Sequence, residues 1–217
     1  MRYIRDFPKS VYFNYRCLSK AQARKLPIHV KWNTKLGILE KNSIIINSEK
    51  IERSMITLGY RGGQFISADK SYFSISDGGK VIFNGICNFG EGFNIAVEGG
   101  TVSFGGNFYA NRNLQIECQK EITFGNDVLL GWNVKLRDTD GHSVIHNGTV
   151  NPYVGEITVG SHVWIASDTT VLKNSKISTG SVIACNSTVC GLKSDKENLL
   201  IGGTPAKVIK ENVEWIE

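Results

Sequence analysis

His142 is the side chain in this sequence that is best placed to move a proton. It follows two acidic residues, Asp138 and Asp140, in the segment RDTDGH. A neutral imidazole takes a proton from an attacking group near physiological pH and passes it on, and a carboxylate at its other ring nitrogen fixes the tautomer. Either aspartate is a candidate for that orienting role, although Asp in such a segment is also typical of a turn. His146, four residues further on, is a second imidazole that could line the same site.

The segments that position these residues follow a six-residue repeat. From Ile157 onward, the third residue of each hexapeptide is aliphatic and β-branched. A helix has no period of six, and a half-buried strand has a period of two without a six-residue modulation. These inward positions are Val159, Ile165, Val171, Ile177, Ile183 and Val189. Upstream, the same spacing gives the triples Phe83, Phe89 and Ile95; Phe104, Ala110 and Ile116; and Phe124, Leu130 and Leu136.

Each triple is one turn of a three-sided coil. The inward residues fill a narrow triangular core, Gly or Asn often follows them at a corner, and stacked coils bury a continuous interior. A β-sandwich has no reason to keep this register, so the fold class is all-β, a stack of parallel coils over residues 28–204. Leu136 and Val159 are 23 positions apart where the pattern requires six. A loop at about 138–156 therefore protrudes from the coil and carries His142.

The two ends have helical spacing. Residues 1–27 are expected to form a helical segment whose apolar side carries Val11, Tyr12, Tyr15 and Leu18. Residues 205–217 are expected to form a C-terminal helix, with Pro205 in its first turn. The apolar side of that helix would carry Val208, Ile209, Val213 and Ile216.

Composition excludes several classes of protein. The chain is 41% hydrophobic and 21% charged, which is typical of a globular domain. Its net charge of +5 includes no basic stripe with interleaved aromatics, so nucleic acid is not an expected partner. No apolar run reaches the roughly 18 residues that cross a bilayer, and the first residues lack a secretory apolar core, so we expect a cytoplasmic protein. Five cysteines without metal or redox spacing indicate reduced thiols.

Three motifs give the chain a specific resemblance. They are NFYANRNL (Asn107 to Leu114), the RDTDGH segment that ends at His142, and VWIAS (Val163 to Ser167), which is followed by SVIACNSTV and GGTPAKVIK. The pattern resembles the hexapeptide-repeat acyltransferases, whose coils form a left-handed parallel β-helix. The sequence is most similar to the sugar O-acetyltransferases of this family, those acting on galactosides and maltose and those of capsule and O-antigen biosynthesis.

This resemblance implies transfer of acetyl from acetyl-CoA to a sugar hydroxyl, with His142 as general base. It implies a homotrimer with active sites between neighbouring subunits and no metal. The acceptor would contact Asn111, Tyr109, Trp164 and His146. Coenzyme A would lie against Trp164, Ala166, Ser167, Ala184, Cys185, Cys190, Lys193, Lys207 and Lys210.

The sequence departs from the family pattern near the cofactor. Ala166 replaces the usual Gly, and Cys190 and Gly191 stand where Thr-Lys is usual, so Lys193 is the possible substitute for the missing lysine. Two alternatives stay open. One is an N-acetyltransferase acting on an amino-sugar nucleotide. The other is a zinc lyase similar to the γ-carbonic anhydrases, which would need His142, His146 and His162 to converge across subunits. His29 is expected to be structural.

Overall fold

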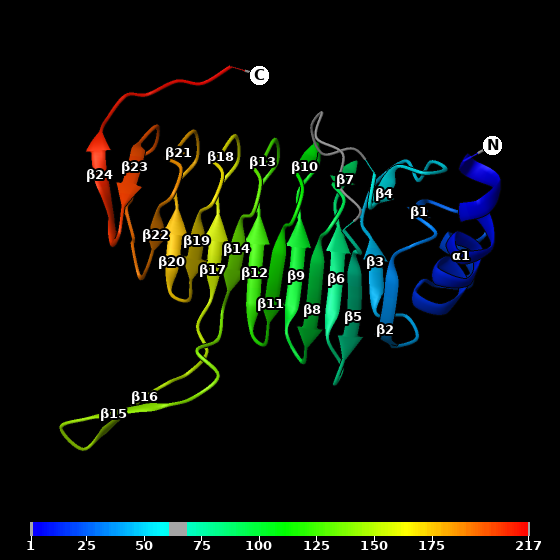
Figure 1. Cartoon of the computed structure of the whole chain (residues 1–217), viewed down its shortest axis with the longest axis horizontal. Helices are drawn as coiled ribbons and strands as arrows, with labels where there is room; N and C mark the ends of the chain where they lie inside the picture. Colours follow the sequence, from blue (N-terminus) through cyan, green and yellow to red (C-terminus); the bar gives the residue numbers. More distant parts are fainter. Residues whose placement is uncertain (1, 61–68, 217) are drawn as a thin grey trace.

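The computed structural model describes residues 2–60 and 69–216 of the chain, and it shows three parallel sheets wrapped around one elongated core (Figure 1). The expected left-handed parallel β-helix is confirmed. Sheet 1 contains β1 (Ile28–Val30), β4 (Ile56–Leu58), β7 (Cys87–Phe89), β10 (Phe108–Ala110), β13 (Leu129–Leu130), β18 (Trp164–Ile165), β21 (Val182–Ile183), β23 (Leu200–Gly203) and β24 (Ala206–Lys210). Sheet 2 contains β2 (Lys35–Leu39), β5 (Tyr72–Ser76), β8 (Asn94–Glu98), β11 (Gln115–Cys118), β14 (Lys135–Arg137), β19 (Thr170–Leu172) and β22 (Thr188–Val189). Sheet 3 contains β3 (Ile44–Ile46), β6 (Lys80–Phe83), β9 (Thr101–Phe104), β12 (Glu121–Phe124), β17 (Ile157–Val159) and β20 (Ser175–Ile177).

The chain visits the three sheets in turn and then starts the next coil. Corner 1 joins sheet 1 to sheet 2, corner 2 joins sheet 2 to sheet 3, and corner 3 returns the chain to sheet 1. Within the stack, a strand pairs in parallel with the equivalent strands of the coils above and below, as β11 pairs with both β8 and β14; β24, at the end of sheet 1, is antiparallel. Every inward residue predicted from the six-residue spacing is buried.

Phenylalanine rings fill the middle of the core. Phe104 stacks on Phe83 and Phe124 at centroid distances of 5.4 and 5.3 Å, and Phe89 and Phe108 meet its ring edge-on. These rings come from successive coils, so the repeat places one large apolar side chain directly above the next. Continuous stacking of this kind makes each coil depend on its neighbours for burial.

Short polar residues turn corner 1. Asn113, Asn133 and Asp168 adopt left-handed backbone conformations, with φ between 58° and 61°. Their side chains also bond from coil to coil, since Asn113 donates to Asn133 at 3.0 Å and Asn133 donates to Asp168 at 2.8 Å. The corner residues therefore stabilise the turn and the stacking of the coils together.

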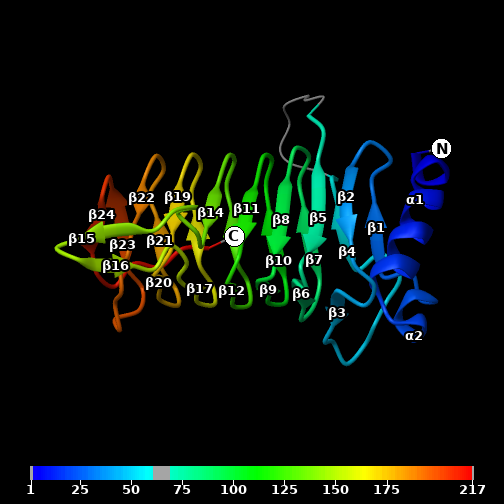
Figure 2. The ribbon, with the colours of Figure 1, turned by 90° about the horizontal axis from the view of Figure 1, so that it is seen from below.

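The expected insertion is an antiparallel hairpin that leaves the coil at corner 2 (Figure 1). It is formed by β15 (Val144–His146) and β16 (Thr149–Asn151), and the side chains of both strands are exposed. The hairpin projects well away from the three sheets (Figures 1 and 2).

The N-terminal segment contains α1 (Arg2–Cys17) and the short α2 (Lys20–Ala23), which close the first coil (Figure 2). The expected helix is present, and Tyr12 and Tyr15 on its apolar side are exposed. The inner face carries Asp6, Ser10 and Asn14, together with Phe13 and Cys17.

Polar residues lie on this inner face because β1 is an edge strand with unpaired backbone groups. Asn14 accepts from the Ile28 N–H at 3.1 Å and donates to the Ile28 carbonyl at 2.6 Å. Ser10 accepts from the Val30 N–H at 2.9 Å. Side chains of α1 thus replace the strand that a preceding coil would supply.

Among the described residues, no helix has the length and apolar character needed to span a bilayer.

The predicted C-terminal helix is wrong. Residues Ala206–Lys210 form β24, which reverses direction and pairs antiparallel with β23. The open edge of sheet 1 offers backbone partners that a short isolated helix would not have, and this decides the conformation. Residues 211–216 continue without regular structure and fold back toward corner 3, where Val213 donates to the Asn198 carbonyl.

Candidate functional site

His142 lies at the start of the corner-2 hairpin with its side chain exposed, and His146 is an exposed residue of β15. Within residues 2–60 and 69–216, neither imidazole has a hydrogen bond to the rest of the chain. Both rings are therefore open to a ligand or to another subunit. The backbone of the hairpin root is ordered by the bond from the Asp140 N–H to the Tyr153 carbonyl at 2.7 Å.

Asp138 has a structural role within this chain. Its side chain is completely buried, and its carboxylate accepts from the backbone N–H groups of Gln119 and Lys120 at 2.8 and 2.7 Å. The Cys118 thiol also lies 3.2 Å from this carboxylate. Both carboxylate oxygens thus bind the neighbouring coil, so the structure argues against Asp138 as the group that orients His142.

Asp140 is the remaining aspartate near His142. It is partly exposed and forms an ion pair with Lys173, with 3.0 Å between the Asp140 Oδ2 and Lys173 Nζ atoms. Lys173 also donates to the Pro152 carbonyl on the returning limb of the hairpin. Lys173 therefore holds both limbs of the hairpin root, and Asp140 keeps one carboxylate oxygen available.

Tyr109 and Trp164 lie in one row on the outer face of sheet 1. In the strand register, Tyr109 pairs with Leu129 and Leu129 pairs with Trp164. Two strand spacings separate them, about 10 Å. Trp164 is exposed and Tyr109 is half-buried, so both present ring surface on the same face.

Corner 1 follows directly from this row and carries small residues. Ala166 and Ala184 lie one coil apart, linked in the ladder through the Ala166 N–H to the Ile183 carbonyl. In the next coil, a Cβ at Gly202 would lie only 3.0 Å from the Cβ of Ala184, so position 202 has no room for a residue larger than glycine. Ser167 and Cys185 stand beside them, and Asn111 turns the same corner two coils earlier. Small side chains here leave the corner open for an elongated ligand.

The remaining predicted cofactor residues lie on other parts of the coil. Lys207 and Lys210 are exposed on β24 of sheet 1. Cys190 is exposed at corner 2, directly after β22. Lys193 lines a cleft of about 280 Å³ beside sheet 3 together with Lys120 and Lys176.

One chain does not bring the predicted site together. His142 and His146 leave from corner 2, whereas Ala166, Ala184 and Asn111 lie at corner 1, at the opposite ends of the strands of sheet 2. Among the described residues, no three His, Cys, Asp or Glu side chains converge as metal ligands.

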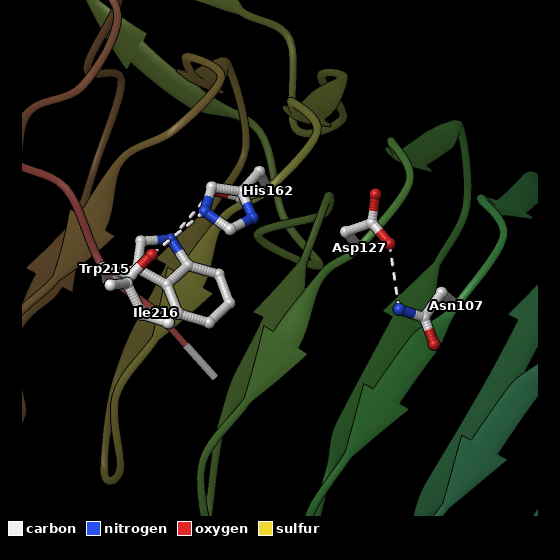
Figure 3. Close-up of a pocket in the computed structure, with 5 residues that line it drawn as sticks. All are labelled: Asn107, Asp127, His162, Trp215 and Ile216. Carbon is white, nitrogen blue, oxygen red and sulfur yellow. Dashed lines mark hydrogen bonds between the residues drawn. The ribbon is translucent and has the colours of Figure 1, made fainter.

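Trp215 makes a contact that the predictions from the sequence do not include. Its ring stacks on His162 with 4.3 Å between centroids, and its indole N–H donates to the His162 carbonyl at 2.9 Å (Figure 3). Asn107 and Asp127 complete the cleft beside this pair, with a volume of about 350 Å³. His162 is an exposed corner residue, and the folded-back C-terminal tail covers part of its ring. The sequence feature that could have suggested this contact is Trp215 itself, a large aromatic residue in an otherwise mostly polar segment.

The buried thiols are unsuited to nucleophilic chemistry. Burial raises the pKa of Cys17 and that of Cys87 to about 12, and burial beside the Asp138 carboxylate raises the pKa of Cys118 further. These three thiols therefore stay protonated at neutral pH.

Comparison with known proteins gives the following relatives. No protein-family model matches the chain. The chain is 38% identical over 117 residues to the galactoside O-acetyltransferase of Escherichia coli K12, covering 52% of this chain and 55% of that protein. It is 30% identical over 145 residues to the putative lipopolysaccharide biosynthesis O-acetyl transferase WbbJ of the same strain, covering 59% of this chain and 73% of that protein. The chain thus spans between about half and three quarters of these curated relatives.

A solved structure shares the fold. The crystal structure of the polySia-specific acetyltransferase NeuO matches with a TM-score of 0.50 and 21% sequence identity, covering 88% of this chain and 79% of that one. At this identity the match bears on architecture alone.

Proposed function

Because this chain belongs to the hexapeptide-repeat acetyltransferases, we propose that it transfers acetyl from acetyl-CoA to a sugar hydroxyl of a surface polysaccharide or its precursor. The observation that carries this proposal is the position of His142. It stands on a hairpin that projects from an otherwise regular coil, with an exposed ring that binds nothing else in the described chain. The relatives are named for a galactoside and for lipopolysaccharide biosynthesis, which supports a sugar as the acceptor.

In the proposed reaction, His142 acts as general base. The imidazole takes the proton of the sugar hydroxyl as its oxygen attacks the thioester carbonyl. A carbon–oxygen bond forms, the carbon–sulfur bond breaks, and the proton passes from the imidazolium to the departing thiolate. An alcohol is a poor nucleophile without such a base, so the rate depends on the position of this ring. Asp140, with its free carboxylate oxygen, is the candidate for orienting the imidazole.

We place the active site between subunits of a homotrimer. The hairpin exposes Val144, Ile145 and Val150, whose apolar side chains have no cover among the described residues. A neighbouring subunit would cover them. Corner 1 of that neighbour would then lie close to His142 of this chain. The separation of corners 1 and 2 within one chain supports this arrangement.

The cofactor would lie along corner 1 of that neighbour. The small residues Ala166 and Ala184 leave space for the pantetheine arm, with Ser167 and Cys185 beside it. Lys207 and Lys210 on β24 would attract the phosphates, and Lys193 and Cys190 would lie toward the other end of the last coil. Tyr109, Trp164 and Asn111 would contact the sugar, since aromatic faces and amides are common carbohydrate partners.

The test is an acetyl-transfer assay with a panel of sugars and capsular glycans. Free thiol release reports turnover, and NMR locates the product ester. His142→Ala should reduce kcat by about 100-fold or more with unchanged thermal stability, because a positioned general base contributes that much. Thr149→Ala, at an exposed position on the same hairpin, is the matched control. A His142→Ala variant with near-normal kcat would exclude the proposed mechanism, and no transfer to any sugar would exclude the acceptor class.

A further inference from the structure

Helix α1 packs Phe13 and Cys17 inward but presents a second apolar stripe to solvent. Ile4, Tyr12 and Tyr15 are 77%, 56% and 51% exposed, and Pro8 and Val11 continue the same stripe along the helix. These positions recur every three or four residues, so they lie on one side of the helix. A helix that only closed the β-helix would have its apolar residues on the inward side alone.

The polar residues of α1 face inward because they form hydrogen bonds with the backbone of the first coil. Asp6, Ser10 and Asn14 face the coil because β1 needs hydrogen-bond partners, and Asp6 also accepts from the Trp32 N–H at 2.8 Å. The exposed stripe is not needed for this contact. Within the part of the chain that the structure describes, no segment covers it.

The charge of the chain is concentrated at the same end. Residues 1–27 contain seven of the 25 Lys and Arg residues but only one of the 20 acidic residues, a formal charge of +6. The 190 residues that follow therefore carry −1 of the total of +5. The single acid, Asp6, is buried. Arg16, Lys20, Arg24 and Lys25 are exposed, and none forms an ion pair with another described residue.

We propose that α1 docks on the surface of a lipid bilayer that contains anionic lipids. An amphipathic helix with aromatic and aliphatic residues on one side and basic residues beside them binds in the plane of the interface. Tyrosine is enriched at this depth of a membrane, and basic side chains attract the anionic headgroups. The helix of 16 residues is about 24 Å long and caps the end of the coil, so it can lie flat on a surface (Figures 1 and 2).

Charge selects the bilayer over a second copy of the chain. A face-to-face pair would bring two segments of +6 together, and like charges across an interface are unfavourable. The bilayer satisfies both the apolar stripe and the basic residues around it.

Vesicle flotation of the full chain tests this proposal without any substrate. Phosphatidylcholine vesicles with phosphatidylglycerol should carry the protein upward, and vesicles of phosphatidylcholine alone should not. Ile4→Ser/Tyr15→Ser and Arg16→Gln/Lys20→Gln should each weaken partitioning about tenfold or more. The controls are Ile86→Ser/Tyr153→Ser and Lys135→Gln/Lys196→Gln, which change exposed residues of the same types outside residues 1–27 and should bind as the wild type does. Circular dichroism verifies that each variant is folded.

Three results would overturn the proposal. The wild type could stay below the anionic vesicles, which would leave an acidic protein as the partner. Partitioning could survive both Ile4→Ser/Tyr15→Ser and Arg16→Gln/Lys20→Gln. Finally, Ile4→Ser/Tyr15→Ser could lower the mass measured by light scattering, in which case the stripe joins two copies of the chain.

Discussion

The buried carboxylate of Asp138 gives the sharpest test of how the hairpin is held. Asp138→Asn preserves the shape of the side chain but replaces one acceptor oxygen with an NH2 group. That group would face one of the two backbone N–H donors, from Gln119 or Lys120, which now lie 2.8 and 2.7 Å from the carboxylate. Hydrogen bonds to a charged group contribute about 1.5–3 kcal/mol each, so the expected loss of unfolding free energy is about 3 kcal/mol or more. For a chain of this size, that lowers Tm by roughly 10 °C.

Differential scanning fluorimetry measures this shift, and hydrogen exchange at the Gln119 and Lys120 amides locates it. Asp140→Asn is the control, because its partly exposed ion pair with Lys173 contributes less than about 1 kcal/mol. If Asp138→Asn kept the wild-type Tm but lost turnover with an altered pH–rate profile, Asp138 would act on His142 and the structural reasoning would be refuted.

Three further predictions concern the core, the hairpin root and pH. Phe104→Ala should lower the unfolding free energy by about 3–5 kcal/mol in urea titrations, and a loss below about 1 kcal/mol would contradict the stacked core. Lys173→Met should speed proteolysis within residues 144–151 and lower kcat while Tm changes little, because it releases both limbs of the hairpin; unchanged proteolysis would show that other contacts hold the root. Burial lowers the pKa of His29 below 6.5, although Asp6 opposes this, so stability should be full above about pH 6.5 and fall as the pH decreases further. Replacing His29 with Gln should flatten that decline in Tm, and an unchanged slope would assign it to other groups.

The coil could be predicted from the sequence because one residue in six must fill its interior. Val159, Ile165 and Phe104 are buried as the spacing predicts, and the insertion at corner 2 follows from a simple count between Leu136 and Val159. Local spacing and tertiary position agree in these coils, since every coil repeats the same environment.

The ends differ because their environment is set by unpaired strand edges, which spacing alone does not show. Asn14 and Ser10 look like surface residues of a helix, yet they bind the edge of β1. Val208 and Ile209 suggested a helix, yet β23 pairs with that segment as a strand. For the site, the motifs predict roles for His142 and Trp164, but only the structure shows that the Asp138 carboxylate accepts hydrogen bonds from the adjacent coil.

The hairpin does not change the strand register of the coils around it. Ile122 on β12 still pairs with Ile157 on β17, although the whole insertion separates β14 from β17 along the chain. Both limbs meet at one corner, so lengthening or replacing the insertion shifts no inward side chain, and each doubling of its length costs only about 0.6 kcal/mol of loop-closure entropy. The length of the hairpin and the residues at its tip can therefore differ between relatives while the coils stay the same. Under the proposed function, exchanging this hairpin as a self-contained graft is therefore a direct way to test whether it influences the choice of acceptor.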